Sequence, residues 1–254
     1  MNQHNFLIDF IIEFESSSNI NESFKVLEKY VEALGFTGVA YSLIPIGLNA
    51  LISQGPVFLV SSNFSPAFLD HYLNANFAAD DFTIKRILKG DLTPMDWWSE
   101  QRNKTLSPAE NHVIQVAKTD YGISNGLSIP TLSTPQLIAG ASVISDIHRH
   151  FTMLIDERLH ILRAIIKLFH QRVCSDSEYR KTFYLPLLTK LTEREKRVLK
   201  YTVTGKAYKT IDDADGISVS SASNARSDLF KRLGVKNASE LAYITGLHNL
   251  IEMI

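Results

Sequence analysis

The sequence predicts an α/β N-terminal domain followed by a small all-α domain of four helices. The first 170 residues alternate between segments with helical apolar spacing and short β-prone segments. About five such strands, with helices before, between and after them, predict one antiparallel sheet covered by helices on both faces. The last quarter of the chain is dense in residues that start and stop helices. A chain of 254 residues with 45% apolar side chains suffices for one or two domains.

Two helices and two strands are expected at the start. Residues 6–14 and 24–34 have apolar side chains at three- and four-residue spacing, and Gly35 ends the second helix. Residues 36–43 and 57–62 are short β-prone segments separated by a loop that contains Gly and Pro. We therefore predict two strands here.

Two serine-proline pairs mark helix starts in the middle of the domain. Ser65 and Ser107 are N-cap residues, each followed by proline at the first helical position. Glu110 completes a capping box with Ser107. Between these helices, residues 91–98 are predicted as a strand or an extended loop.

A hairpin and a long helix complete the domain. Residues 126–132 and 137–145 have the spacing of two hairpin strands. Residues 152–173 are predicted as one helix of about six turns, long enough to contribute to a dimer interface. Its apolar stripe consists of Ile155, Leu159, Leu162, Ile166 and Phe169.

A break in periodicity separates the two domains. Residues 175–188 are rich in Ser, Asp, Glu, Arg and Lys and contain Pro186, which indicates a linker. The domains are accordingly expected at residues 1–174 and 189–254.

The C-terminal domain begins with two predicted helices. Thr192 forms a capping box with Glu195, and Gly205 supplies the left-handed residue that ends this first helix. A second, shorter helix is expected over residues 208–214, buried through Ile211.

A turn and two further helices follow. Gly216 allows a sharp reversal, Ser218 caps a third helix over residues 219–233, and Gly234 ends it. Residues 237–240 repeat the pattern of a cap followed by glutamate and start the fourth helix. Four short helices around one core, with a tight turn before the third, are typical of a helix-turn-helix domain.

The third helix has the chemistry of a DNA-reading helix. A major groove admits a slim polar face, on which asparagine suits adenine and arginine suits guanine or phosphate. Residues 189–254 hold eleven Lys and Arg against eight Asp and Glu, so this segment is about +3 and the remainder about −4. The candidate DNA-binding residues are Ser220, Ser221, Ser223, Asn224, Arg226, Ser227 and Lys231. The helix pattern alone fits a helical protein-binding domain equally well.

Several groups of residues in this domain fall, without a gap, at the spacing of one known family. They are Leu191 to Glu195, Val198-Leu199, Gly205-Lys206, Ile211, Ile217-Ser218 and Leu233 to Val235. In these residues the domain resembles the DNA-binding domain of the LuxR-type transcription regulators, which implies DNA binding. Thr210, Asp212 and Asp215 depart from the family's usual residues, and acids near phosphates weaken non-specific attraction.

Aromatic residues and one acid mark a candidate ligand pocket in the N-terminal domain. Phe64, Phe68 and Tyr72 lie four residues apart on one helical face, and Asp81 follows nine residues later. These residues also fit a purely structural interpretation, in which the aromatic side chains form core and Asp81 caps a helix.

The same residues resemble the autoinducer-binding domain of the LuxR-type regulators. That domain has an aromatic-x3-Trp-x3-Tyr helix, an Asp-Pro pair, a later Trp, and a Gly before the following strand. The matching positions are Phe64, Phe68, Tyr72, Asp81-Phe82, Trp97 and Gly126. The resemblance implies that Asp81 accepts a hydrogen bond from a ligand amide, with Thr83 and Ser142 supplying further polar contacts. The implied ligand-binding residues are Phe64, Phe68, Tyr72, Asp81, Thr83, Trp97 and Ser142.

Two hydrogen-bond donors of that family are missing here. In the family, a tyrosine hydroxyl and a tryptophan N–H donate to the carbonyl groups of an acyl-homoserine lactone, whereas Phe64 and Phe68 stand at the matching positions. A buried carbonyl without a donor costs about 1 to 3 kcal/mol. We expect either a ligand with a donor for Asp81 and a less polar head group, or an acyl-homoserine lactone bound weakly.

The sequence contains no catalytic motif that competes with this interpretation. A Gly-rich phosphate loop, His-Glu-x-x-His and Gly-x-Ser-x-Gly are all missing, so we predict neither an enzyme nor a cofactor. Asp146, His148 and His150 alternate at a strand end, which favours a solvated turn over a metal site. The single cysteine, Cys174, excludes an internal disulfide and fits a reducing cytoplasm.

The chain shows no secretory signal, because residues 6–14 are interrupted by acids, and no apolar segment long enough to span a bilayer. We therefore predict a cytoplasmic, dimeric, ligand-responsive transcription regulator that binds a small signal molecule and palindromic promoter DNA. The alternative is an interaction protein whose degenerate C-terminal domain binds a protein partner and not DNA.

Overall fold

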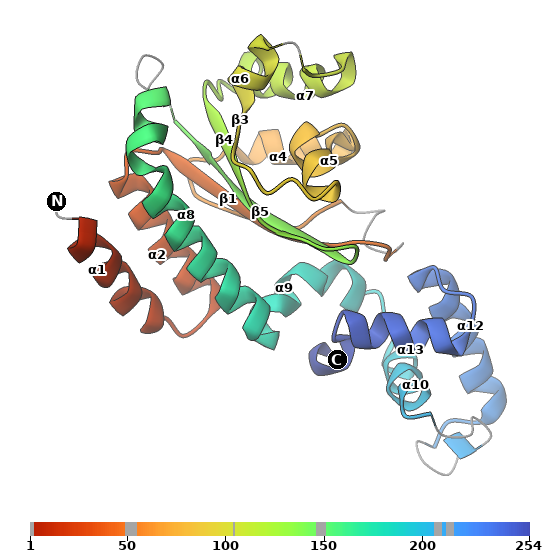
Figure 1. The fold of residues 1–254 in the computed structure, drawn as a ribbon. Coiled ribbons are helices and arrows are strands. Elements are labelled where there is room, and N and C mark those ends of the chain that lie inside the picture. The colour runs from red at the N-terminus through yellow and green to blue at the C-terminus, as the bar shows by residue number, and fades with distance from the viewer. Residues whose placement is uncertain (1–2, 49–54, 104, 146–150, 206–209, 212–215) are drawn as a thin grey trace. The chain divides into compact units, whose positions relative to one another are not determined.

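The computed structural model describes residues 3–48, 55–103, 105–145, 151–205, 210–211 and 216–254 (Figure 1). The chain divides into two compact units. The first unit comprises Met1–Ile44 and Pro56–Arg180, and the second comprises Pro45–Gly55 and Lys181–Ile254.

A five-stranded sheet forms the centre of the first unit, with the strand order β2-β1-β5-β4-β3. Antiparallel pairing joins β1 to β2, β3 to β4 and β4 to β5, so the predicted antiparallel sheet is confirmed. The strands are β1 (Gly38–Pro45), β2 (Phe58–Val60), β3 (Met95–Asp96), β4 (Gly126–Ser133) and β5 (Leu137–Ile144).

Three helices cover one face of this sheet: α1 (Gln3–Glu15), α2 (Ile20–Ala33) and α8 (Phe151–Ser175) (Figure 1). The apolar periodicity predicted all three. Helix α2 starts earlier than expected, because the Asn19 side chain caps it by accepting a hydrogen bond from the Glu22 N–H at 3.0 Å.

Four shorter helices lie on the opposite face: α4 (Pro66–Asn74), α5 (Phe82–Leu88), α6 (Trp97–Arg102) and α7 (Pro108–Thr119) (Figure 1). A 3-10 turn, η1 (Phe77–Ala79), follows α4. Ser65 caps α4, and Ser107 forms the predicted capping box with Glu110 at the start of α7. Helices therefore cover both faces of the sheet, as predicted.

Helices α5 and α6 were not among the predicted elements, although the structural interpretation of Asp81 as a helix cap is consistent with α5. Each begins after an aspartate, Asp81 or Asp96, whose side chain accepts hydrogen bonds from the first amides of the helix. Because α6 starts at Trp97, the segment 91–98 contributes only the two-residue strand β3. The predicted strand or extended loop is therefore present over residues 91–96, and only Trp97 and Trp98 belong to a helix instead.

A helix also occupies the segment that we expected to be an aperiodic linker. Helix α9 (Ser177–Leu188) includes Pro186, and the boundary between the two units falls after Arg180 within it. Besides its charged residues, this segment contains a set of buried apolar side chains that were not recognised in the sequence as the buried side of a helix. These are Tyr179, Phe183, Tyr184, Leu187 and Leu188.

The described helices of the second unit after α9 are α10 (Glu193–Val203), α12 (Val219–Leu233), α13 (Ala238–Leu247) and the 3-10 helix η3 (Leu250–Met253). The Thr192–Glu195 capping box forms, and Gly234 ends α12 at a φ of 72°. The buried core includes Val198, Leu199, Ile211, Ala222, Leu229, Leu233 and Leu241.

Several predictions fall outside the described residues. They concern most of the second helix of the C-terminal domain, at residues 208–214, together with Asp215 and the segment of Asp146, His148 and His150. Within the part of the chain that is described, no helix has the length and apolar character needed to cross a membrane.

Candidate functional site

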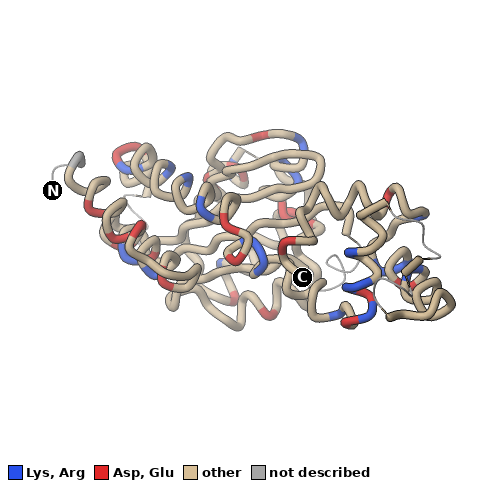
Figure 2. The backbone as a smooth tube through the Cα atoms, turned by 90° about the horizontal axis from the view of Figure 1, so that it is seen from below, with Lys and Arg blue, Asp and Glu red and all other residues tan. Residues whose placement is uncertain are grey.

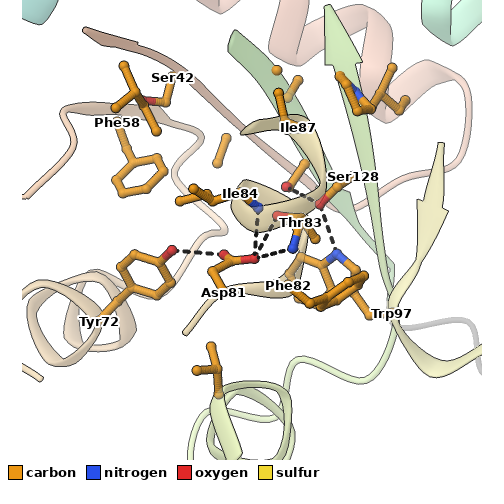
Figure 3. Close-up of a pocket in the computed structure, with 18 of the residues that line it drawn as sticks. Ser42, Phe58, Tyr72, Asp81, Phe82, Thr83, Ile84, Ile87, Trp97 and Ser128 are labelled. Atoms are coloured by element: carbon orange, nitrogen blue, oxygen red, sulfur yellow. Dashed lines mark hydrogen bonds between the residues drawn. The ribbon is translucent and has the colours of Figure 1, made fainter. Parts of the chain in front are cut away.

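The first unit contains a cavity of about 100 Å³ between the sheet and helices α4, α5 and α7 (Figure 3). One water molecule needs roughly 10 to 15 Å³ on this scale, so the cavity has room for part of a small organic molecule. Its walls are mostly aliphatic and aromatic. All seven residues proposed from the sequence line it, namely Phe64, Phe68, Tyr72, Asp81, Thr83, Trp97 and Ser142.

The aromatic residues of α4 serve both as core and as cavity wall. Phe68 and Tyr72 are 5% exposed, and their ring centroids lie 6.0 Å apart in an edge-on arrangement. The ring centroids of Phe58 and Tyr72 lie 5.6 Å apart, and those of Tyr121 and Phe68 lie 5.4 Å apart, both pairs edge-on. Edge-on ring packing therefore positions the aromatic side chains of this wall.

Asp81 combines a structural and a polar role. Its Oδ1 accepts hydrogen bonds from the Thr83 N–H at 2.8 Å, the Thr83 hydroxyl at 2.7 Å and the Ile84 N–H at 3.4 Å, and thereby caps α5. Its Oδ2 accepts a hydrogen bond from the Tyr72 hydroxyl at 2.8 Å (Figure 3). Burial, with the Asp81 charge, raises the pKa of Tyr72 well above its usual value, so that hydroxyl remains a donor.

Each oxygen of a carboxylate has the capacity to accept about two hydrogen bonds. Oδ1 of Asp81 is occupied by the helix cap, whereas Oδ2 has one donor and retains capacity for another. The structural and the ligand-binding interpretations of Asp81 are thus compatible, because they use different oxygen atoms.

A second polar group lies on the strands. The Trp97 indole N–H donates to the Ser128 Oγ at 2.9 Å (Figure 3), and the Ser128 and Ser142 hydroxyls are 2.8 Å apart. The sequence analysis missed Ser128. The predicted hairpin alone does not reveal it, because Ser128 lies opposite Ser142 only as a result of the register shift between Pro130 and Leu132.

Two carboxylic acids, Asp81 and Glu110, line the cavity. Glu110 pairs with Lys85 at 3.3 Å and accepts from the Ser107 N–H at 2.8 Å, and this backbone hydrogen bond lowers the pKa of Glu110. No Lys or Arg is among the described residues that line the cavity. An anionic ligand group would therefore lie near Asp81 without a compensating cation.

In the second unit, the candidate DNA-binding residues lie on α12, and none of them is buried. Ser220, Asn224, Ser227 and Lys231 are exposed, whereas Ser221, Ser223 and Arg226 are partly exposed. The opposite side of the helix packs into the core through Ala222, Ala225, Leu229 and Leu233.

Local contacts orient several of these side chains. The Ser227 hydroxyl donates to the Ser223 carbonyl at 3.0 Å, and the Arg226 guanidinium lies over the Phe230 ring at 5.8 Å. The Asn224 side chain is exposed to solvent. Figure 2 shows both signs of charge along the chain of each unit, in agreement with the modest positive charge of residues 189–254.

Comparison with protein families decides the identity of both domains. Residues 19–173 match the family described as autoinducer binding domain, and residues 189–245 match the family described as bacterial regulatory proteins, luxR family. The chain belongs to the LuxR-type regulators. These regulators are transcription factors, which confirms the prediction that the protein is not an enzyme.

Solved structures of LuxR-type regulators share the fold. Escherichia coli SdiA has a TM-score of 0.58 and 16% identity, with 98% of each chain covered. SdiA in complex with octanoyl-rac-glycerol has a TM-score of 0.57 and 15% identity, covering 99% of this chain and 97% of that chain. At these identities the likeness concerns the fold alone. No curated protein sequence shows a significant match.

Proposed function

We propose that this LuxR-type protein is a ligand-responsive transcription regulator whose pocket binds a neutral molecule with an apolar acyl tail. The observation that carries the proposal is the polar group in an otherwise apolar cavity: Asp81 Oδ2 has capacity for one more donor. The apolar and aromatic walls provide the surface against which a tail is buried.

The polar part of the ligand is inferred from the groups that face it. Among the described residues, the lining holds two acids and no Lys or Arg, which favours a neutral head group with an N–H or O–H for Asp81. Phe64 and Phe68 provide ring surface but no donors. These features favour a head group that needs fewer hydrogen-bond donors from the protein than a homoserine lactone does. The octanoyl-rac-glycerol named with SdiA is one such molecule, since its hydroxyl groups donate and its ester accepts.

We propose further that the protein acts in the cytoplasm as a homodimer on palindromic promoter DNA. One small helical unit buries little surface on DNA, so specific binding normally requires two copies on half-sites about one helical turn apart. Helix α12 presents Asn224 and Lys231 to solvent, where they would reach base edges and phosphates.

A gel-shift experiment with promoter fragments at fixed salt tests this function. Wild-type protein should retard a specific fragment, with an affinity that changes when octanoyl-rac-glycerol is added. Replacing both Asn224 and Arg226 by Ala should weaken specific binding by about 1 to 3 kcal/mol for each base-reading contact. Undiminished binding by the double variant would contradict the placement of α12, and failure of the wild-type protein to bind any fragment would favour the protein-binding alternative.

A further inference from the structure

The elements that enclose the cavity are held together by contacts of unequal strength. Helix α5 is tied to the sheet by the Ser133 hydroxyl, which donates to the Ile87 carbonyl at 2.6 Å. It is tied to α4 by the Tyr72 hydroxyl, which donates to Asp81, the N-cap residue of α5, at 2.8 Å. Both contacts hold α5 in place on two sides of the cavity.

Two ion pairs join α5 to the helices that follow it, and their geometries differ. Arg86 forms two hydrogen bonds with the Glu100 carboxylate of α6, at 2.7 and 2.8 Å, which is the strong bidentate arrangement. Lys85 lies 3.3 Å from the Glu110 carboxylate of α7. Among the described residues, this pair is the only hydrogen bond or ion pair between α5 and α7.

Apolar packing joins α7 to α4, and α5 takes no part in it. Phe68 and Tyr72 of α4 share one buried cluster with Val113 and Val116 of α7. Over the part of the chain that is described, this cluster includes no residue of α5. Helices α5 and α7 both border the cavity, for example through Ile84 and Val113. Separating α5 from α7 therefore breaks few apolar contacts.

The Lys85–Glu110 pair lies where the cavity meets solvent. Glu110 lines the cavity, and its side chain is 18% exposed, whereas the Lys85 side chain is 34% exposed. Asp80, just before α5, also pairs with Lys85, at 3.2 Å, and is 50% exposed. Exposure thus rises from the cavity wall outward through the three charged groups. A partly exposed ion pair is weak and is screened by salt, so this contact opens more readily than the others around the cavity.

We propose that the ligand enters and leaves the cavity between α5 and α7, and that the Lys85–Glu110 ion pair breaks at each passage. This inference rests on the proposed ligand-binding function and adds the route by which the pocket is filled. The pair is intact in both the empty and the filled protein. It therefore controls the rates of association and dissociation and leaves the affinity unchanged.

Ligand-binding kinetics test the inference. The full-length protein is mixed rapidly with octanoyl-rac-glycerol, and tryptophan fluorescence is followed because Trp97 lines the cavity. Lys85→Met removes the charge and keeps an unbranched aliphatic side chain. It should raise both the association and the dissociation rate constants by about two- to fivefold, the range for loss of an exposed ion pair, with an unchanged Kd.

Matched variants separate the contact between the helices from a general effect of charge. Asp80→Asn removes the other partner of Lys85 but leaves α5 joined to α7, so it should leave both rate constants unchanged. Glu110→Gln breaks the pair from the α7 side, while glutamine still suits the capping box with Ser107. It should speed association as Lys85→Met does, and the double variant should be no faster than either single variant.

Ionic strength provides an independent test on the wild-type protein. Octanoyl-rac-glycerol is uncharged, so salt acts on the charges of the protein alone. Raising the NaCl concentration from roughly 0.02 M to 0.5 M should speed association and dissociation in the wild-type protein but not in Lys85→Met.

Equal rate constants for Lys85→Met and the wild-type protein would overturn the inference and leave the proposed function intact. Faster dissociation with unchanged association would also overturn it, since Lys85 would then stabilise the complex. The same holds if Asp80→Asn accelerates both steps as much as Lys85→Met does. If octanoyl-rac-glycerol does not bind the wild-type protein, the proposed acyl-ligand function fails, and the inference fails with it.

Discussion

Aromatic residues pack against both faces of the sheet, but they form core on one face and line a cavity on the other. Beneath α1, α2 and α8, aromatic rings pack into a filled core: Phe169 is fully buried, and its ring centroid lies 5.0 Å from that of Tyr41 and 5.8 Å from that of Phe24. Beneath α4, α5 and α7, aromatic rings pack at similar distances but enclose a cavity. Aromatic composition alone therefore does not distinguish a core from a pocket.

The faces differ in how their polar groups are satisfied. On the filled face, the Tyr41 hydroxyl lies 2.8 Å from the His170 Nδ1, and the Ser23 hydroxyl lies 2.8 Å from the Tyr179 hydroxyl, so the protein supplies both partners. On the cavity face, Asp81 retains capacity for a ligand. Unused hydrogen-bonding capacity in an apolar enclosure is what distinguishes the proposed binding site from the core.

Truncation of one aromatic residue on each face should give the largest difference. Phe169→Ala should lower the free energy of unfolding by about 3 to 5 kcal/mol, because it opens a cavity in filled core. Phe68→Ala should cost less, since its ring already borders empty space and has fewer contacts to lose. Urea unfolding followed by tryptophan fluorescence reports on the first unit alone, because both tryptophans, Trp97 and Trp98, lie there. Equal losses for the two variants would contradict the contrast.

The filled face should also respond to acid. Burial, with a smaller contribution from the Lys167 charge, lowers the pKa of His170 from 6.5 to about 4. The unfolded chain therefore binds more protons than the folded one between these values, and stability falls as the pH drops from about 6.5 to 4.

The loss attributable to His170 should approach about 3 kcal/mol across this window, at 1.36 kcal/mol for each unit of pKa difference. Urea unfolding at several pH values measures it. His170→Gln should flatten the pH dependence, whereas His112→Gln, which removes an exposed histidine, serves as the control. A wild-type free energy of unfolding that stays constant from pH 6.5 to 4 would show that His170 is not held neutral by the fold.

A smaller effect is expected where the cavity wall is tightest. Gly126→Ala places a methyl group 2.3 Å from Trp97 and should destabilise the first unit by about 1 to 3 kcal/mol, with a shift in tryptophan emission. Gly246→Ala is the matched control. It lies within α13, has no atom within 4 Å of an added Cβ, and should stabilise that helix by about 0.5 to 1 kcal/mol. An unchanged emission spectrum for Gly126→Ala would mean that the indole has room to move.

Local chemistry explains what the sequence predicted correctly. Capping residues such as Ser65, Ser107 and Thr192 act within one helical turn, so their helices could be identified directly. The strands of the β4–β5 hairpin were likewise recognisable from their short connection.

What the sequence analysis missed depends on tertiary contacts. Helices α5 and α6 have only 7 and 6 residues, too short for a clear apolar period, and α9 hides its buried aromatic residues among charges. Ser128 is an ordinary serine until strand register places it opposite Ser142 and the fold brings Trp97 above it. The resemblance identified seven cavity residues, but the hydrogen bonds that join Trp97, Ser128 and Ser142 required the structure.

The central claim is that the cavity binds a neutral acyl molecule whose head group needs fewer hydrogen-bond donors than a homoserine lactone. Calorimetric titration with two ligands tests it. The wild-type protein should bind octanoyl-rac-glycerol more tightly than N-octanoyl-homoserine lactone, because Phe64 and Phe68 offer no donors to the lactone. Phe68→Trp should restore one indole donor and tighten lactone binding by roughly tenfold. Nanomolar binding of the lactone by the wild-type protein would contradict the account.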